Sequence, residues 1–340
     1  MRILLLLLSM IITLALRAQP AIDIWYGEEQ YFGYPACAQN WINVLGNVNP
    51  ADDIAKLSYQ LNGGSEKLLT LGSDLHRLAR AGDFNIELDW DEVSEGSNTL
   101  TITAEDKRGK ITSTEVTLEV VKANAWPLPY ALDFSRVEDL QRAAQVVDGK
   151  WVLTEDGVRT AEPYYDRVLT IGDSSWVNYE VNLSLTVHDF TPPEPGPPTY
   201  DVSHFGVALR WRGHVPDGRQ PNRQWYPLGS QGELLLRAEG DSCRWRVLRG
   251  GGEQWMPTPF SGYRSIALGR KLQIRAQVET LPDGQHVYRF KQWNAAETEP
   301  TKWDVEAYEA SQRDFASGAF CIVPHNSDVT IHRVEALPIR

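Results

Sequence analysis

The sequence HFGVALRWRGH, residues 204–214, alternates apolar and polar side chains with a period of two. Alternate positions of an extended chain point to opposite sides, so this pattern predicts a β-strand with one face in a hydrophobic core. The residues expected on the core side are Phe205, Val207, Leu209 and Trp211. Similar alternating stretches are SNTLTITAED (97–106), STEVTLEVV (113–121), NYEVNLSLTVHDF (178–190), CRWRVLR (243–249), KLQIRAQVE (271–279), HVYRFKQW (286–293) and SDVTIHRVEAL (327–337).

Turn-forming residues separate these stretches, and apolar residues rarely recur at the spacing of three and four that is typical of amphipathic helices. The main exception is VEDLQRAAQVV, residues 137–147, for which we expect one short helix or helical turn. Many short alternating strands bounded by Gly, Pro, Asn and Asp are typical of antiparallel β-sandwiches. The sequence therefore predicts an all-β fold.

The chain of 340 residues is longer than most single domains, so we expect two. The alternation stops at VVKANAWPLPYALDF, where a Pro-containing segment over residues 122–130 predicts an interdomain linker. We expect the first sandwich over residues 19–121 and the second over residues 131–340.

The chain begins with one Arg, an apolar run and a small residue at position 18, the pattern of a secretory signal peptide over residues 1–18. No second apolar run follows, so we expect no membrane anchor and a secreted or periplasmic protein. A formal net charge of −12 argues against a nucleic-acid partner. The three cysteines are too few for a disulfide framework. Neighbouring strands would allow a bridge between Cys243 and Cys321, and the alternative is two unpaired, buried thiols.

Two predicted hairpins mark the first domain. LSYQLNGGSEKLL, residues 57–69, places an Asn-Gly-Gly turn between two strands, and EGSNTLTITAEDKRGKITSTEVTLEV, residues 95–120, places a turn at residues 107–110. The second stretch resembles the immunoglobulin-like modules of bacterial secreted proteins. That resemblance implies an immunoglobulin-like sandwich that acts as a spacer or adhesive unit.

The second half of the chain resembles another sandwich. The order of DGKWVLTEDGVRT, YYDRVLTIGDSSWVNYEVNLSLTV, HFGVALRWRGH, KLQIRAQVE, VYRFKQWNAAETEPTKWDVEA and SGAFCIVPHNSDVTIHRVEAL is similar to the laminin-G-type, concanavalin A-like lectin/glucanase jelly roll. This resemblance implies a jelly roll over residues 131–340. It does not fix the function, because that fold occurs in lectins, carbohydrate-binding modules, glycosidases, lyases and spacers.

The outer positions of the predicted strands are rich in Arg and Gln, although the protein is acidic overall. Arg offers planar bidentate donors to a carboxylate or sulfate, and a Trp on the same side would stack on a sugar ring. We expect this face to bind an acidic or polar glycan. The alternative is a solvated sheet face whose Arg side chains have acidic partners. The predicted ligand-binding residues are Arg210, Arg212, His214, Arg275, Gln277, Lys291 and Trp293.

Two acidic or histidine-containing stretches could suggest catalysis. ELDWDE, residues 87–92, matches the Glu-x-Asp-x-x-Glu spacing of glucanases, but it lies in the first domain, where we expect an exposed strand end and turn. Near the C-terminus, His325, Asp328 and His332 lie within eight residues. Alternation places His332 on an outer face and His325 in a turn, so we expect no convergence. No Gly-x-Ser-x-Gly elbow or paired zinc-binding motif occurs, and we predict no catalytic residue.

The jelly-roll resemblance implies a structural calcium ion, with Asp133 and Asp328 as candidate ligands. The sequence as a whole predicts a secreted, non-catalytic, lectin-like protein whose partner is an extracellular or cell-surface polysaccharide. An acidic polysaccharide is one candidate. One alternative is a glycoside hydrolase or polysaccharide lyase. A second alternative is a structural or adhesive protein that binds no sugar.

Overall fold

The computed structural model describes residues 19–34, 36–190, 203–237, 242–252, 254–258, 262, 264–310 and 314–339. Its regular structure is almost entirely β-strand, which confirms the predicted all-β fold. The predicted signal peptide, residues 1–18, lies outside the described residues. In the part of the chain that the structure describes, no helix is long and apolar enough to span a membrane. The helical elements there are the 3-10 turns η1 (Ala51–Asp53), η2 (Phe134–Arg136) and η3 (Leu140–Arg142).

The N-terminal sandwich has one sheet in the order β1-β3-β6 and another in the order β2-β8-β7-β4-β5. β2 and β8 pair in parallel, whereas β4–β5 and β7–β8 form the two predicted hairpins. A separate hydrophobic core lies between these sheets. The strands are β1 (Ala21–Ile24), β2 (Glu29–Phe32), β3 (Trp41–Asn49), β4 (Ile54–Leu61), β5 (Lys67–Leu68), β6 (Asp83–Asp89), β7 (Gly96–Asp106) and β8 (Ile111–Val120).

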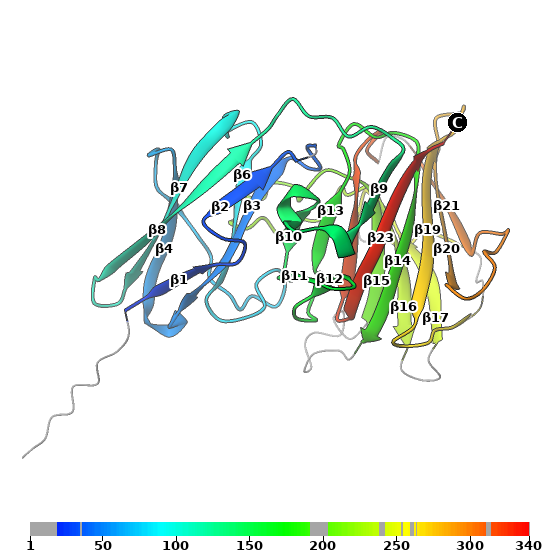
Figure 1. Cartoon of the computed structure of the whole chain (residues 1–340). Helices are drawn as coiled ribbons and strands as arrows, with labels where there is room; N and C mark the ends of the chain where they lie inside the picture. Colours follow the sequence, from blue (N-terminus) through cyan, green and yellow to red (C-terminus); the bar gives the residue numbers. More distant parts are fainter. Residues whose placement is uncertain are drawn as a thin grey trace, which may run out of the picture.

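The C-terminal sandwich packs a seven-stranded sheet, β10-β13-β22-β15-β16-β17-β18, against an eight-stranded sheet, β11-β12-β23-β14-β19-β20-β21, with β9 paired to β23 (Figure 1). The strands are β9 (Tyr130–Asp133), β10 (Gln145–Asp148), β11 (Trp151–Thr154), β12 (Gly157–Thr160), β13 (Val168–Ile171), β14 (Tyr179–Asp189), β15 (Ser203–Trp211), β16 (Ser230–Arg237), β17 (Ser242–Leu248), β18 (Arg264–Ser265), β19 (Lys271–Thr280), β20 (His286–Asn294), β21 (Val305–Glu309), β22 (Ala319–His325) and β23 (Asp328–Pro338). The short helix or helical turn predicted within 137–147 is the 3-10 turn η3, which is followed by β10.

β15 follows the predicted alternation except at its end. Phe205 and Leu209 enter the core between the sheets, as predicted, but Trp211 packs in a second cluster with Ala208 on the outer face. The register with β22 shifts between Leu209 and Trp211, and Arg210 has φ +62°. This bulge exchanges the sides of Arg210 and Trp211, because an extra residue in a strand reverses the direction of the side chains that follow.

The two sandwiches lie side by side and share buried contacts (Figure 1). Leu45 of β3 joins the main core of the C-terminal sandwich. Trp126, in the predicted linker, is also buried in that core, and its backbone N donates a 2.8 Å hydrogen bond to Asp173 Oδ2. The segment between the sandwiches is therefore packed against the second one.

Candidate functional site

A cavity of about 650 Å³ lies at one end of the C-terminal sandwich, next to the N-terminal one. The backbone N of Asn40 donates to the carbonyl of Arg212, and that of Ser174 to Cys37, so both sandwiches meet at its margin. The residues that line the cavity are Ser174, Ser175, Val177, Arg212, Thr280, Gly284, His286, Ala316 and Ser317. Its hydroxyl groups and cationic side chain suit a polar, anionic ligand.

Arg212 supplies the positive charge of this cavity. Its guanidinium lies 5.6 Å from the centre of the Phe315 ring, and its buried Nε has no hydrogen-bond partner. Among the described residues, no carboxylate lies within ion-pair distance of Arg212. An anionic ligand would satisfy both the charge and the buried N–H group, since Arg binds carboxylates through planar paired donors.

Arg210, two residues earlier, has a structural role instead. Its side chain is fully buried and donates to the carbonyls of Val177 and Phe315 and to Thr280 Oγ1. The predicted ligand-binding role is therefore wrong for Arg210, because the bulge directs it into the end of the core. Its bonds hold Val177 and Thr280 in place, and both line the cavity.

His286 lines the cavity and is oriented by a carboxylate. Its Nδ1 lies 2.8 Å from Asp314 Oδ2, and the hydroxyl of Tyr288 donates to the same oxygen. Asp314 therefore contacts Nδ1 and not Nε2. A carboxylate in this position fixes the tautomer of a histidine base. Sequence analysis missed this site. The available signal was a histidine on the inward face of β20 with Tyr288 and Phe290.

The structure separates the seven predicted ligand-binding residues. Arg210 lies at the end of β15 in the seven-stranded sheet and Arg212 directly follows that strand, whereas Arg275 and Lys291 lie on β19 and β20 in the eight-stranded sheet. The predicted single face is therefore wrong, because alternation identifies the outer side of a strand but not the sheet to which it belongs. Gln277 lies on β19 and Trp293 on β20.

The Arg-rich face of the eight-stranded sheet is already neutralised. Arg275 Nη1 lies 3.0 Å from Glu299 Oε1, and Lys291 Nζ lies 2.6 Å from the same oxygen. Gln277 Nε2 donates to Glu180 Oε2, and Lys291 Nζ lies over the Trp293 ring at 5.9 Å. These partners match the alternative of a solvated sheet face with acidic side chains opposite.

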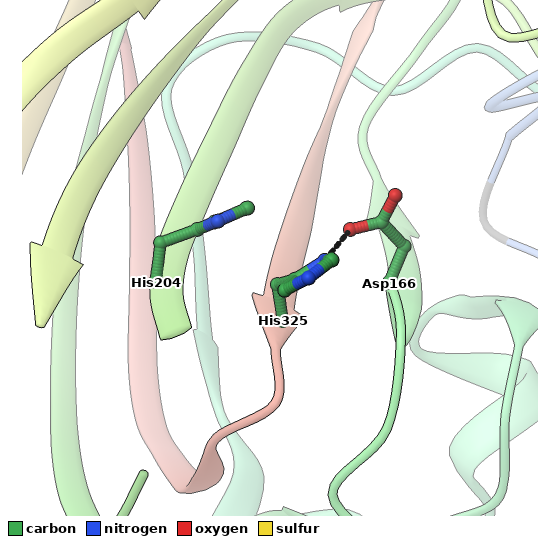
Figure 2. A group of neighbouring side chains, drawn as sticks. All are labelled: Asp166, His204 and His325. Carbon is green, nitrogen blue, oxygen red and sulfur yellow. Dashed lines mark hydrogen bonds and ion pairs between the residues drawn. The ribbon is translucent and has the colours of Figure 1, made fainter. Parts of the chain in front are cut away.

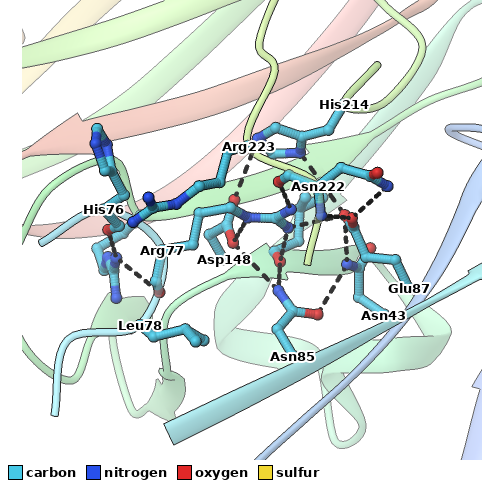
Figure 3. A network of polar contacts seen from close by, with 12 residues as sticks. Asn43, His76, Arg77, Leu78, Asn85, Glu87, Asp148, His214, Asn222 and Arg223 are labelled. Atoms are coloured by element: carbon cyan, nitrogen blue, oxygen red, sulfur yellow. Dashed lines mark hydrogen bonds and ion pairs between the residues drawn. The ribbon is translucent and has the colours of Figure 1, made fainter. Parts of the chain in front are cut away.

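His214 is buried in a polar network between the sandwiches (Figure 3). Arg77 is the centre of this network, with Nη2 2.9 Å from Glu87 Oε1 and Nε 2.6 Å from Asp148 Oδ1. Glu87 also accepts hydrogen bonds from the backbone N and Nδ2 of Asn222. Burial, together with the charge of Arg77, lowers the pKa of His214 well below its usual value.

Glu87 was expected at an exposed strand end, and this prediction is wrong because the second sandwich covers it. The other carboxylates of ELDWDE point elsewhere: Asp89 accepts from the backbone N of Asp91, and Glu92 pairs with Lys67 at 2.9 Å. The three carboxylates therefore do not form a catalytic triplet.

The C-terminal group is also separated. His332 Nε2 lies 2.8 Å from Thr186 Oγ1 at a second cavity, of about 470 Å³, on the eight-stranded sheet. His325 is the last residue of β22 in the other sheet, where its Nδ1 lies 2.8 Å from Asp166 Oδ1. Asp328 binds the guanidinium of Arg159 through both oxygens.

The two candidate calcium ligands do not meet. Asp133 pairs in register with Arg333 on β23, five residues beyond Asp328. Its carboxylate accepts from the backbone N and hydroxyl of Ser135, whereas Asp328 is engaged by Arg159. One ion cannot contact both carboxylates at this separation.

All three cysteines are free. Cys243 points into the core between the sheets, whereas Cys321 lies in the outer cluster with Val323. The open possibility of a Cys243–Cys321 bridge is therefore excluded, because β15 and β16 separate their strands and the side chains face opposite sides.

No known protein-family model and no curated protein matches this sequence. The chain is similar in part to the metal-free VIP36 exoplasmic/lumenal domain, with 9% identity, a TM-score of 0.38 and coverage of 62% of this chain and 92% of that one. It is similar to a xylan β-1,4-xylosidase from Bacillus halodurans, with 10% identity, a TM-score of 0.39 and coverage of 88% and 63%. An endo-β-1,4-mannanase from Thermotoga petrophila has 12% identity and a TM-score of 0.24, with coverage of 31% of this chain and 20% of the mannanase.

These TM-scores are too low to carry an argument about function. The β-sandwich architecture follows from the strand order of the chain itself. The immunoglobulin-like and laminin-G-type assignments stay predictions.

Proposed function

We propose that this protein is a secreted carbohydrate-binding protein whose cavity at Arg212 binds the acidic end or branch of an extracellular glycan. The observation that carries the proposal is a guanidinium without an ion pair among the described residues, at the wall of a cavity of about 650 Å³. A carboxylate or sulfate group is the sugar substituent that matches it.

The rest of the lining offers both hydroxyl groups and apolar contact. Ser174, Ser175, Ser317 and Thr280 offer hydroxyl groups for hydrogen bonds with sugar hydroxyls, while Val177 offers apolar contact. The volume lies within the range of about 300–1,000 Å³ that is typical of small-molecule sites.

Binding of uronate-containing oligosaccharides tests the proposal, with isothermal titration calorimetry as the measurement. We expect Arg212→Ala to weaken binding by at least about tenfold, because it removes the ion pair. The matched control is Arg275→Ala, on the far sheet, which should leave the affinity unchanged. Wild-type protein that binds no acidic glycan, or an effect of Arg275→Ala but not of Arg212→Ala, would contradict the proposed site.

A second candidate function is cleavage of the glycan by a hydrolase or lyase. The specific observation in its favour is the carboxylate-oriented His286 beside Arg212, since proton abstraction next to a uronate requires a base and a neutralising cation. Incubation with acidic polysaccharides, followed by ultraviolet absorbance and reducing-end assays, separates the two functions. A catalyst loses turnover in His286→Ala, whereas a binding protein shows no turnover in the wild type.

A further inference from the structure

Three potential metal ligands from distant parts of the sequence converge on the outer side of the seven-stranded sheet (Figure 2). His204 lies near the start of β15, His325 ends β22, and Asp166 precedes β13. One ligand atom of each lies within 4.8 Å of the others. Two imidazoles and one carboxylate form a donor set that suits divalent transition metals.

His204 has no hydrogen bond to either ring nitrogen, although the residue is only 5% exposed. Buried polar groups in proteins nearly always have a partner, so an imidazole without one needs an explanation. Its Nδ1 lies 3.5 Å from Glu233 Oε2 without forming a hydrogen bond. Its ring is stacked on that of His325, with the ring centres 4.7 Å apart and an interplanar angle of 12°.

The carboxylate of Glu233 lies next to Nδ1 of the His204 ring. Arg246 Nη2 lies 2.7 Å from Glu233 Oε2, and Gln231 Nε2 donates to Oε1, so the carboxylate is fixed in place. If Nε2 of His204 binds a cation, Nδ1–H faces Glu233. A ligating histidine usually donates its other N–H group to such a carboxylate.

The ligand atoms must approach one another when an ion binds. Tetrahedral zinc ligands lie roughly 3.4 Å apart, whereas these atoms span up to 4.8 Å. Movement of the His204 ring breaks no hydrogen bond of that ring, because neither nitrogen has one.

We propose that Asp166, His204 and His325 bind one divalent transition-metal ion of the zinc class. The two imidazoles argue against calcium, which takes oxygen ligands. This site is independent of the proposed glycan cavity, because His204 and Arg212 lie eight residues apart along one strand, roughly 25 Å.

The test is isothermal titration of the chelator-treated full chain with Zn²⁺ alone, with Co²⁺ absorption as a probe of coordination. We expect one Zn²⁺ per wild-type chain and a cobalt spectrum that shows nitrogen ligands. His204→Gln and Asp166→Asn should each weaken Zn²⁺ binding by at least about tenfold. Zn²⁺ should also raise the melting temperature of the wild type but not of the variants.

The matched control is His332→Gln, which removes a histidine from the eight-stranded sheet and should leave the zinc affinity unchanged. Asp166→Asn keeps the test valid if His204→Gln does not fold, because the Asp166 side chain is partly exposed. Wild-type protein that binds no Zn²⁺, or binds it as tightly after Asp166→Asn, overturns the proposal. Neither result affects the glycan cavity at Arg212.

Discussion

Arg77 of the N-terminal sandwich and Asp148 of the C-terminal sandwich form a buried ion pair, with 2.6 Å between Nε and Oδ1. The same guanidinium pairs with Glu87 and donates to the carbonyl of Asn222 (Figure 3). A buried charge without its partner raises the free energy of the folded protein. Separation of the sandwiches would leave several charged groups without their partners. The network therefore makes the relative position of the two sandwiches specific.

Arg77→Ala should lower the free energy of unfolding by about 3–5 kcal/mol, because it leaves Glu87 and Asp148 buried without their cation. Urea unfolding followed by tryptophan fluorescence measures this loss. The control is Arg80→Ala, since Arg80 is 68% exposed and also reaches across to the second sandwich, at Glu162. Its effect should be at most about 1 kcal/mol. Equal losses in both variants would contradict a special role of burial.

The buried histidines should make an unfavourable contribution to stability as the pH drops below about 6.5, the value at which an unfolded histidine gains its proton. Burial lowers the folded-state pKa of His204 and of His214, so the unfolded chain binds more protons in this range. The loss is at most about 1.4 kcal/mol per pH unit for each residue.

His214→Gln isolates one of these contributions. Burial raises the pKa of Asp148 to about 7 and also raises that of Glu233; both carboxylates act with the opposite sign, but both are present in the two proteins that are compared. Urea unfolding at several pH values should show the wild type losing stability faster than His214→Gln during acidification. Parallel curves would exclude His214 as a source of the pH dependence.

Arg210 and Arg212, two residues apart, should respond differently to truncation. Arg210→Ala removes a fully buried side chain and its hydrogen bonds to two carbonyls and should cost about 3 kcal/mol or more of stability. Arg212→Ala should cost less than about 1 kcal/mol, because its guanidinium makes no ion pair with the described residues. Thermal melting of the two variants compares them directly. A similar loss in both would make Arg212 a structural residue.

The thiols should react with a thiol reagent only after unfolding. Burial raises the pKa of Cys37 to about 11 and of Cys243 to about 12, and it also raises that of Cys321 well above the usual value. The reactive thiolate is therefore rare in the folded protein. Titration with a chromogenic disulfide should count three thiols in denaturant, and a reducing agent should leave the melting temperature unchanged. Fewer than three thiols would reveal a disulfide.

The strands were predictable because their signals are local. Alternation in Phe205 and Leu209 depends only on neighbouring residues, and the turn at 107–110 requires only its own sequence. The reversal at Arg210 was not predictable, since a bulge depends on the partner strand.

The candidate sites could not be predicted from the sequence, because each site is formed by residues that lie far apart in the chain. His325 reads as a turn residue in the sequence, yet it meets Asp166, which is 159 residues away. The sequence predicts that Glu87 lies at an exposed strand end, whereas in the structure the second sandwich covers it. Arg212 was identified as a ligand candidate from the sequence, but His286 and Asp314 were not, because no local pattern relates a strand to the segment that packs against it.

The position of β23 has a consequence for the order of folding. This strand pairs with β9, β12 and β14, which end at residues 133, 160 and 189, whereas β23 begins at Asp328. During synthesis these three strands are made well before β23, with which they pair. By then all strands of the N-terminal sandwich have been made. A chain interrupted before Asp328 would present open strand edges to other chains, which is a route to aggregation.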